Sequence, residues 1–205
     1  MSMKRPYRMA RAAWLLGLAW LSSAALAQAD EARARKIVGG VCFVCHGMEG
    51  ESAGEAFARL AGQHGEYIAR QLEHFKSGKR KNAAMADMAA RLTPDEMLAL
   101  GKYFEKQVVA PVPPRDKELA AAGQTLYHQG KQQMGWPACA SCHGPDARGA
   151  ATLPRLAGQV AGYTQSRLRQ FQQREGGREA VAAHAALARM GPQDMAAVAE
   201  YLSSK

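Results

Sequence analysis

The sequence predicts an all-α protein built from two copies of one small domain. The motif Cys-x-x-Cys-His occurs twice, and the segments that follow the two copies repeat one another at a spacing of 96 or 97 residues. Around both motifs, apolar residues recur at helical spacing, and no stretch shows the alternation typical of a half-buried strand. A repeat of this length indicates a duplicated domain rather than the short unit of a solenoid.

The two motifs use all four cysteines of the chain, as Cys42-Phe43-Val44-Cys45-His46 and Cys139-Ala140-Ser141-Cys142-His143. Two thiols separated by two residues can reach the two vinyl groups of one haem, and the adjacent imidazole can then lie beneath the iron. We therefore predict two covalently attached haem c groups. The predicted attachment residues are Cys42, Cys45, Cys139 and Cys142, and the predicted proximal iron ligands are His46 and His143.

A single Cys-x-x-Cys pair has two other interpretations. A thioredoxin-like redox pair would require a βαβ setting, which the pattern around these motifs does not favour. Half of a zinc site would leave unexplained why a histidine and then a glycine, Gly47 or Gly144, follow each pair. The motif, the repeat and an export signal together favour haem.

Residues 1–27 have the pattern of a secretory signal peptide. Four basic residues precede an apolar stretch, Ala12 to Leu21, and cleavage is expected after Ala27 or, alternatively, after Ala29. The apolar stretch is short for a membrane span of about 20 residues, so an uncleaved anchor is the weaker interpretation. We expect a periplasmic protein, because haem is attached to such cysteine pairs after secretion into an oxidising compartment.

The charge of the chain argues against nucleic acid as a partner. The formal charge of +9 falls by 4 when the basic residues of the signal peptide are removed. Haem propionates lower the charge further, and the modest imbalance that remains suits transient docking to redox proteins.

The first domain is expected to span 28–107. A helix from Ala32 to Val41 should lead into the first motif, and a second from Glu66 to Ser77 has apolar residues at i, i+4 and i+7. Thr93-Pro94-Asp95-Glu96 is a strong helix start, with threonine as N-cap, proline at N1 and glutamate at N3. That helix should run to about Gln107.

A proline-rich linker, 108–115, should form a stiff extended spacer before the second domain, 116–205. In the second domain a longer loop, Gly130 to Ala138, precedes the motif. The expected helices are Lys117 to Gln129, Gly162 to Gln173 and Pro192 to Ser203. Each domain has a small core that a haem would complete.

Beyond the motifs, the string Arg-Leu-Ala-Gly-Gln is identical in the two copies, at 59–63 and 155–159, and a tyrosine follows four residues later as Tyr67 or Tyr163. With these motifs the chain resembles the cytochrome c4 family. The resemblance implies two class I cytochrome c-like domains, each wrapped on one covalent haem, in an exported protein that carries electrons. It also implies a histidine and a methionine on each iron.

On that resemblance, the methionine of the first domain is Met85, by its distance from the helix start at Thr93, with Met88 as the alternative. The second domain departs from the pattern, because Ala183 stands at the corresponding position and has no donor atom. His184, the next residue, is the favoured ligand, and a vacant site remains open. Other candidates, ranked lower, are Met190, Met195 and Met134.

The sequence also offers candidates for the groups that contact the proximal imidazoles and the haem propionates. The proximal imidazoles should donate to backbone carbonyls. The resemblance implies the carbonyl of a proline before the repeated string, which Pro154 matches in the second domain, and Ala58, which stands there in the first, can offer its own carbonyl. Four residues are candidates for contacts with the haem propionates: Gln63, Tyr67, Gln159 and Tyr163. An interpretation as ordinary surface residues at a helix start is nearly as good.

The favoured function is electron transfer between respiratory-chain donors and a terminal oxidase or similar acceptor. Nothing in the chain resembles an acid, a base and a nucleophile around a substrate pocket, so we do not expect an enzyme. A cytochrome subunit of an extracytoplasmic dehydrogenase is one alternative. A haem enzyme or sensor that uses an unusually ligated second haem is another. The expected partners are redox proteins, and the sequence leaves peripheral membrane association open.

Overall fold

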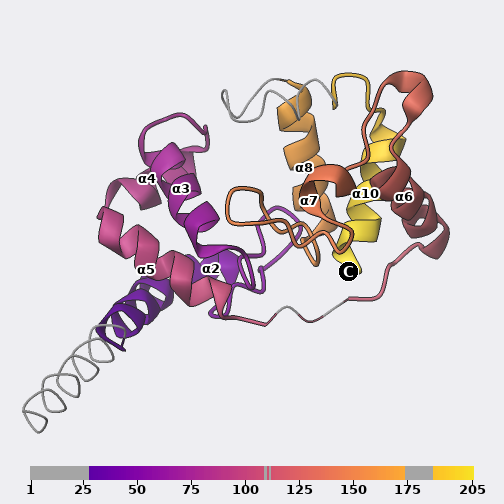
Figure 1. Cartoon of the computed structure of the whole chain (residues 1–205). Helices are drawn as coiled ribbons and strands as arrows, with labels where there is room; N and C mark the ends of the chain where they lie inside the picture. Colours follow the sequence, from indigo (N-terminus) through magenta and orange to yellow (C-terminus); the bar gives the residue numbers. More distant parts are fainter. Residues whose placement is uncertain (1–27, 109, 111, 174–186) are drawn as a thin grey trace, which may run out of the picture.

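The computed structural model describes residues 28–108, 110, 112–173 and 187–205. These residues form two groups of helices that lie side by side, one for each copy of the repeat (Figure 1). The first group comprises residues 28–37, η1 (Val38–Cys42), α2 (Phe43–His46), α3 (Gly65–Lys76), α4 (Ala83–Ala90) and α5 (Pro94–Glu105). The second comprises α6 (Lys117–Gln129), η2 (Gln132–Met134), α7 (Ala140–His143), α8 (Ala161–Gln172) and α10 (Pro192–Ser203).

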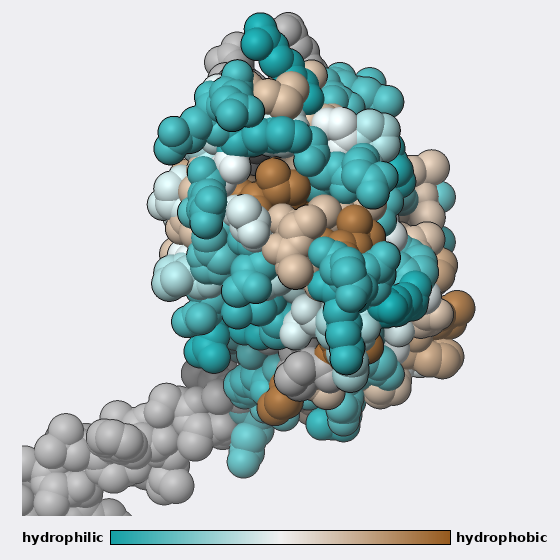
Figure 2. Space-filling model, turned by 90° about the vertical axis from the view of Figure 1, so that its right-hand side faces the viewer, coloured by the Kyte–Doolittle hydropathy of each residue, from teal (hydrophilic) through white to brown (hydrophobic). Residues whose placement is uncertain are grey.

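The all-α prediction is confirmed. Within the described ranges the only β pairing is two isolated bridges, Lys131 with Trp136 and Ala150 with Leu153. None of the helices described there has the length and apolar character needed to cross a bilayer. The face on the α6 side of the molecule is mostly hydrophilic, with apolar residues in small separate groups (Figure 2).

In the first group, α3 packs against α5 at a point where two glycines meet. A Cβ on Gly101 would lie 2.2 Å from the carbonyl oxygen of Gly65, so only glycine permits this approach. The N-terminus of α5 has the predicted capping box, in which Glu96 N donates to Thr93 Oγ1 (3.2 Å) and Thr93 N donates to Glu96 Oε2 (2.9 Å). The buried apolar residues of this core are Ala34, Val38, Ile68, Ala99, Leu100, Tyr103 and Phe104.

In the second group, α6 packs against α10 at a single glycine. A Cβ on Gly123 would lie 1.9 Å from the carbonyl oxygen of Ala197. The buried carboxylate of Glu200 on α10 accepts hydrogen bonds from the backbone N–H groups of Arg115 and Asp116, which fastens the end of the linker to this domain. The buried core residues are Tyr127, Trp136, Ala147, Ala157, Met190, Met195, Val198, Tyr201 and Leu202.

Two elements differ from the sequence-based expectations. The first helix begins at least four residues earlier than expected and passes through the π-helical turn η1 into α2. The segment around Met85, for which no helix was expected, is α4. Its alanines favour a helix, and Asn82 caps it by accepting a hydrogen bond from Met85 N (2.9 Å).

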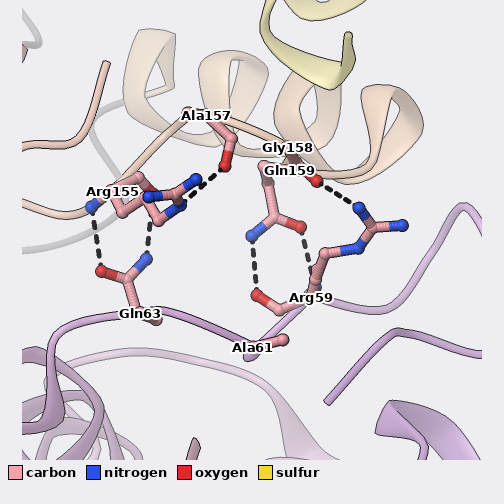
Figure 3. Close-up of a pocket in the computed structure, with 7 residues that line it drawn as sticks. All are labelled: Arg59, Ala61, Gln63, Arg155, Ala157, Gly158 and Gln159. Carbon is pink, nitrogen blue, oxygen red and sulfur yellow. Dashed lines mark hydrogen bonds between the residues drawn. The ribbon is translucent and has the colours of Figure 1, made fainter. Parts of the chain in front are cut away.

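The two domains meet through the duplicated Arg-Leu-Ala-Gly-Gln strings (Figure 3). The amide of Gln63 accepts from Arg155 N and donates to Arg155 O, both at 2.9 Å. The amide of Gln159 accepts from Arg59 N (2.8 Å) and donates to Arg59 O (2.9 Å). Each copy therefore gives the other the same pair of hydrogen bonds, as around an approximate two-fold axis.

Candidate haem sites

In each motif the first cysteine is the N-cap of a short helix, α2 or α7, which carries the second cysteine and ends at the histidine. The glycine that follows has φ of 77° at Gly47 and 78° at Gly144, values at which a side chain would be strained. A tyrosine hydroxyl then fixes the chain just beyond the histidine. Tyr103 donates to Met48 O (2.9 Å) in the first domain, and Tyr127 donates to Gly144 O (2.6 Å) in the second.

The histidine of each motif is held by a backbone carbonyl, as expected from the family resemblance. His46 Nδ1 lies 2.8 Å from Ala58 O, and His143 Nδ1 lies 3.1 Å from Pro154 O. A carbonyl oxygen can only accept, so Nδ1 donates and the lone pair of Nε2 is left for a metal. Burial lowers the pKa of both imidazoles, and this favours the neutral form that can bind iron.

None of the four cysteines forms a disulfide, so all four sulfur atoms are available for thioether bonds. Burial raises the pKa of the Cys42 and Cys139 thiols, which keeps them protonated. Across the described residues, no group of three or more His, Cys, Asp or Glu side chains is placed to hold a metal ion, which gives the zinc interpretation no support. Paired reduced thiols beside an oriented neutral imidazole fit a covalent haem.

The iron ligand on the side away from the histidine has candidates in both domains, and the structure describes all of them except Ala183 and His184. Met85 and Met88 are both half-buried and lie one turn apart on α4, which packs against α3. In the second domain, Met190 and Met195 are buried in the core and Met134 packs against it. Ala183 and His184 lie outside the described residues.

Of the four candidates for the propionate side, three make hydrogen bonds across the domain boundary. The amides of Gln63 and Gln159 are occupied by the domain interface. Tyr163 accepts a hydrogen bond from Arg80 Nη2 at 2.8 Å, across the domain boundary. Arg80 could not be recognised from the repeat, because the offset of 96 residues places Gly176 at its counterpart.

Comparison with known proteins agrees with this arrangement. Residues 29–104 match a family model described as cytochrome c oxidase, cbb3-type, subunit III, and residues 120–205 match one described as cytochrome c. The cytochrome c4 of Thiocapsa roseopersicina is 42% identical over 186 residues, which cover 85% of this chain and 90% of that protein. The chain belongs to the cytochrome c4 family.

Two further relatives of the chain extend this picture. The crystal structure of reduced recombinant cytochrome c4 from Pseudomonas stutzeri superimposes with a TM-score of 0.78 at 30% identity, covering 83% of this chain and 96% of that one. A protein named thiosulfate dehydrogenase electron acceptor, from Thiomonas intermedia, is 34% identical over 80% of this chain and 78% of its own length. As a cytochrome c4, this chain carries two covalent haem c groups and is an electron-transfer protein, not an enzyme.

Proposed function

We propose that the chain is an exported periplasmic carrier that passes single electrons from a respiratory-chain donor to a terminal oxidase. In this proposal Cys42 and Cys45 hold the first haem, with His46 and Met85 on its iron. Cys139 and Cys142 hold the second, with His143 and, as favoured sixth ligand, His184. The observation that supports it most strongly is the pair of oriented imidazoles, each donating from Nδ1 to a backbone carbonyl.

The haem supplies the one-electron iron couple, and the chain supplies a fixed environment for it. The carbonyls of Ala58 and Pro154 set the tautomer and the orientation of each imidazole. The reciprocal amide bonds of Gln63 and Gln159 hold the two domains in one relative position. No side chain has to give or take a proton, which suits repeated oxidation and reduction without rearrangement.

The surface beside the first motif supports docking of a redox partner there. Val41, Phe43 and Val44 have exposed fractions of 45%, 43% and 64%, although all three are apolar. The second motif has the smaller Ala140 and Ser141 between its cysteines. A small apolar patch next to a cofactor is typical of transient contacts between electron-transfer proteins.

A second function is favoured by the Thiomonas relative, whose name describes the acceptor of a thiosulfate dehydrogenase. In that case the donor is a periplasmic dehydrogenase, and the electron still leaves toward an oxidase. The two functions therefore differ in the donor and agree in the direction of transfer.

Stopped-flow measurements would test both. The ferrous protein should be oxidised rapidly by membranes that contain a terminal oxidase and oxygen, and the oxidation should stop when cyanide is added. The ferric protein is then mixed with thiosulfate and a thiosulfate dehydrogenase to test the second function. A failure of the membranes to oxidise the ferrous protein would contradict the carrier proposal. A mature N-terminus at residue 28 or 30, found by mass spectrometry, would support export.

A further inference from the structure

One arginine of the first domain lies at the domain boundary and is held from both sides. Arg80 follows α3 and precedes Met85 by five residues. Its guanidinium stacks 4.4 Å above the ring of Phe75 and donates from Nη1 to Gln71 Oε1 at 2.8 Å. From Nη2 it donates to the hydroxyl of Tyr163, in the second domain, also at 2.8 Å. A cation of one domain is thus fixed by a side chain of the other.

The same boundary gathers further polar and positive groups. Tyr67 lies close to Tyr163, and burial raises the pKa of Tyr67, with smaller opposing effects from the charges of Arg80, Arg167 and Arg70. Arginines of both domains therefore lie near this pair of interface tyrosines. A tyrosine hydroxyl carries no charge at neutral pH, so Tyr163 does not balance the charge of Arg80.

A second guanidinium lies over the equivalent phenylalanine of the other domain. Arg167 lies 4.5 Å from the centre of the Phe171 ring, much as Arg80 lies over Phe75. Phe75 and Phe171 are equivalent residues of the two copies. The boundary thus presents a guanidinium on the same phenylalanine of each domain.

Arg80 forms no ion pair with a carboxylate in the part of the chain that the structure describes. Removing a cation partly from water is costly unless an anion compensates for it. A guanidinium favours carboxylates in particular, because its planar N–H groups match the two oxygens. The four propionates of the two haems are the carboxylates that this protein adds to its own chain.

We propose that Arg80, held across the boundary by Tyr163, is a shared counter-charge for propionates of both haems and so raises both reduction potentials. This inference rests on the proposed function, because it requires a haem in each domain. A fixed positive charge favours the iron state with one positive charge fewer, which is the ferrous state. Arg80 should therefore raise both potentials, and it acts by positioning and charge rather than by binding iron.

Three variants of the whole holoprotein separate this role from a structural one. Arg80→Gln removes the charge, so the equilibrium constant for reduction of each haem should fall about tenfold. For a one-electron couple this lowers each reduction potential by about 59 mV. Tyr163→Phe keeps the charge but releases it from the second domain, so only the second potential should fall. Lys102→Gln removes an exposed charge of α5 and is the control, for which neither potential should move.

Each potential is followed separately through the haem methyl signals in NMR spectra during stepwise reduction. A pyridine haemochrome assay first establishes two haems in each variant, so a failure of the haem assignment is recognised before any potential is interpreted. If Arg80→Gln leaves both potentials unchanged, or lowers only the first, a shared counter-charge is excluded. If Arg80→Gln does not retain haem, Tyr163→Phe decides alone, and an unchanged second potential in that variant overturns the proposal.

Discussion

Replacing Gly123 by alanine should destabilise the second domain, although alanine is the better helix former. A Cβ at this position of α6 would lie 1.9 Å from Ala197 O, 2.4 Å from Ala197 C and 2.9 Å from Tyr201 Cβ. An ordinary contact between carbon and oxygen is about 3.3 Å. The two helices must therefore separate by more than about 1 Å, because the atoms in the way are mainly backbone atoms of α10 that cannot rotate aside.

The size of the effect follows from two opposing contributions. Alanine gains about 0.5 to 1 kcal/mol over glycine inside a helix. Forcing an extra methyl into a well-packed core costs typically about 1 to 3 kcal/mol, and a clash with backbone belongs at the upper end. We expect the free energy of unfolding to fall by about 2 kcal/mol, and this loss should appear as a lower denaturation midpoint.

The assay is guanidinium chloride unfolding of the holoprotein, followed by circular dichroism at 222 nm. Ala122→Gly, at an exposed position of the same helix, is the control and should cost only about 0.5 to 1 kcal/mol. Gly101→Ala, where a Cβ would lie 2.2 Å from Gly65 O, should repeat the effect in the first domain. A Gly123→Ala protein as stable as the wild type would refute the close backbone approach of α6 and α10.

Three other changes have defined outcomes. Met85→Ala should abolish the near-infrared band from sulfur to ferric iron and lower the first potential, and if Met88→Ala removes the band instead, the assigned sulfur is wrong. His184→Ala should open the second haem to carbon monoxide in the reduced protein, and methionine sulfur on both irons of the wild type would contradict this. Tyr127→Phe should cost about 1 to 3 kcal/mol, because Gly144 O loses a buried donor. Burial raises the pKa of Tyr127 in the folded protein. As pH rises above about 10, the unfolded chain therefore loses the phenol proton before the folded protein does, and the free energy of unfolding should fall. The fall should be smaller in Tyr127→Phe, which has no phenol proton at this position.

The helices that carry clear local signals could be predicted from the sequence. The helix Lys117–Gln129 has the predicted bounds, and α5 begins at the predicted capping box. The carbonyls of Ala58 and Pro154 were also predicted, because the family resemblance implies that the residue before the repeated string faces the imidazole. For the two helices, a local rule and the fold favour the same structure.

The features that depend on tertiary contacts could not be predicted. Gln63 and Gln159 were considered for the propionate side, but their amides bind the other domain, and only the identity of the two strings hinted at this. Arg80 had no signal, because its partner Tyr163 is 83 residues away and its own copy offers no counterpart. The helix α4 was missed because its alanines give almost no contrast between its faces.

The reciprocal contact between Gln63 and Gln159 has a consequence for how such a chain could arise. Each glutamine amide binds main-chain atoms of an arginine, so the contact needs no particular partner side chain. A single domain with this string would already be complementary to a second copy of itself. The tandem chain is thus equivalent to a symmetric dimer of one-haem domains in which the linker replaces an encounter in solution. It turns a contact dependent on concentration into one that every molecule makes within itself.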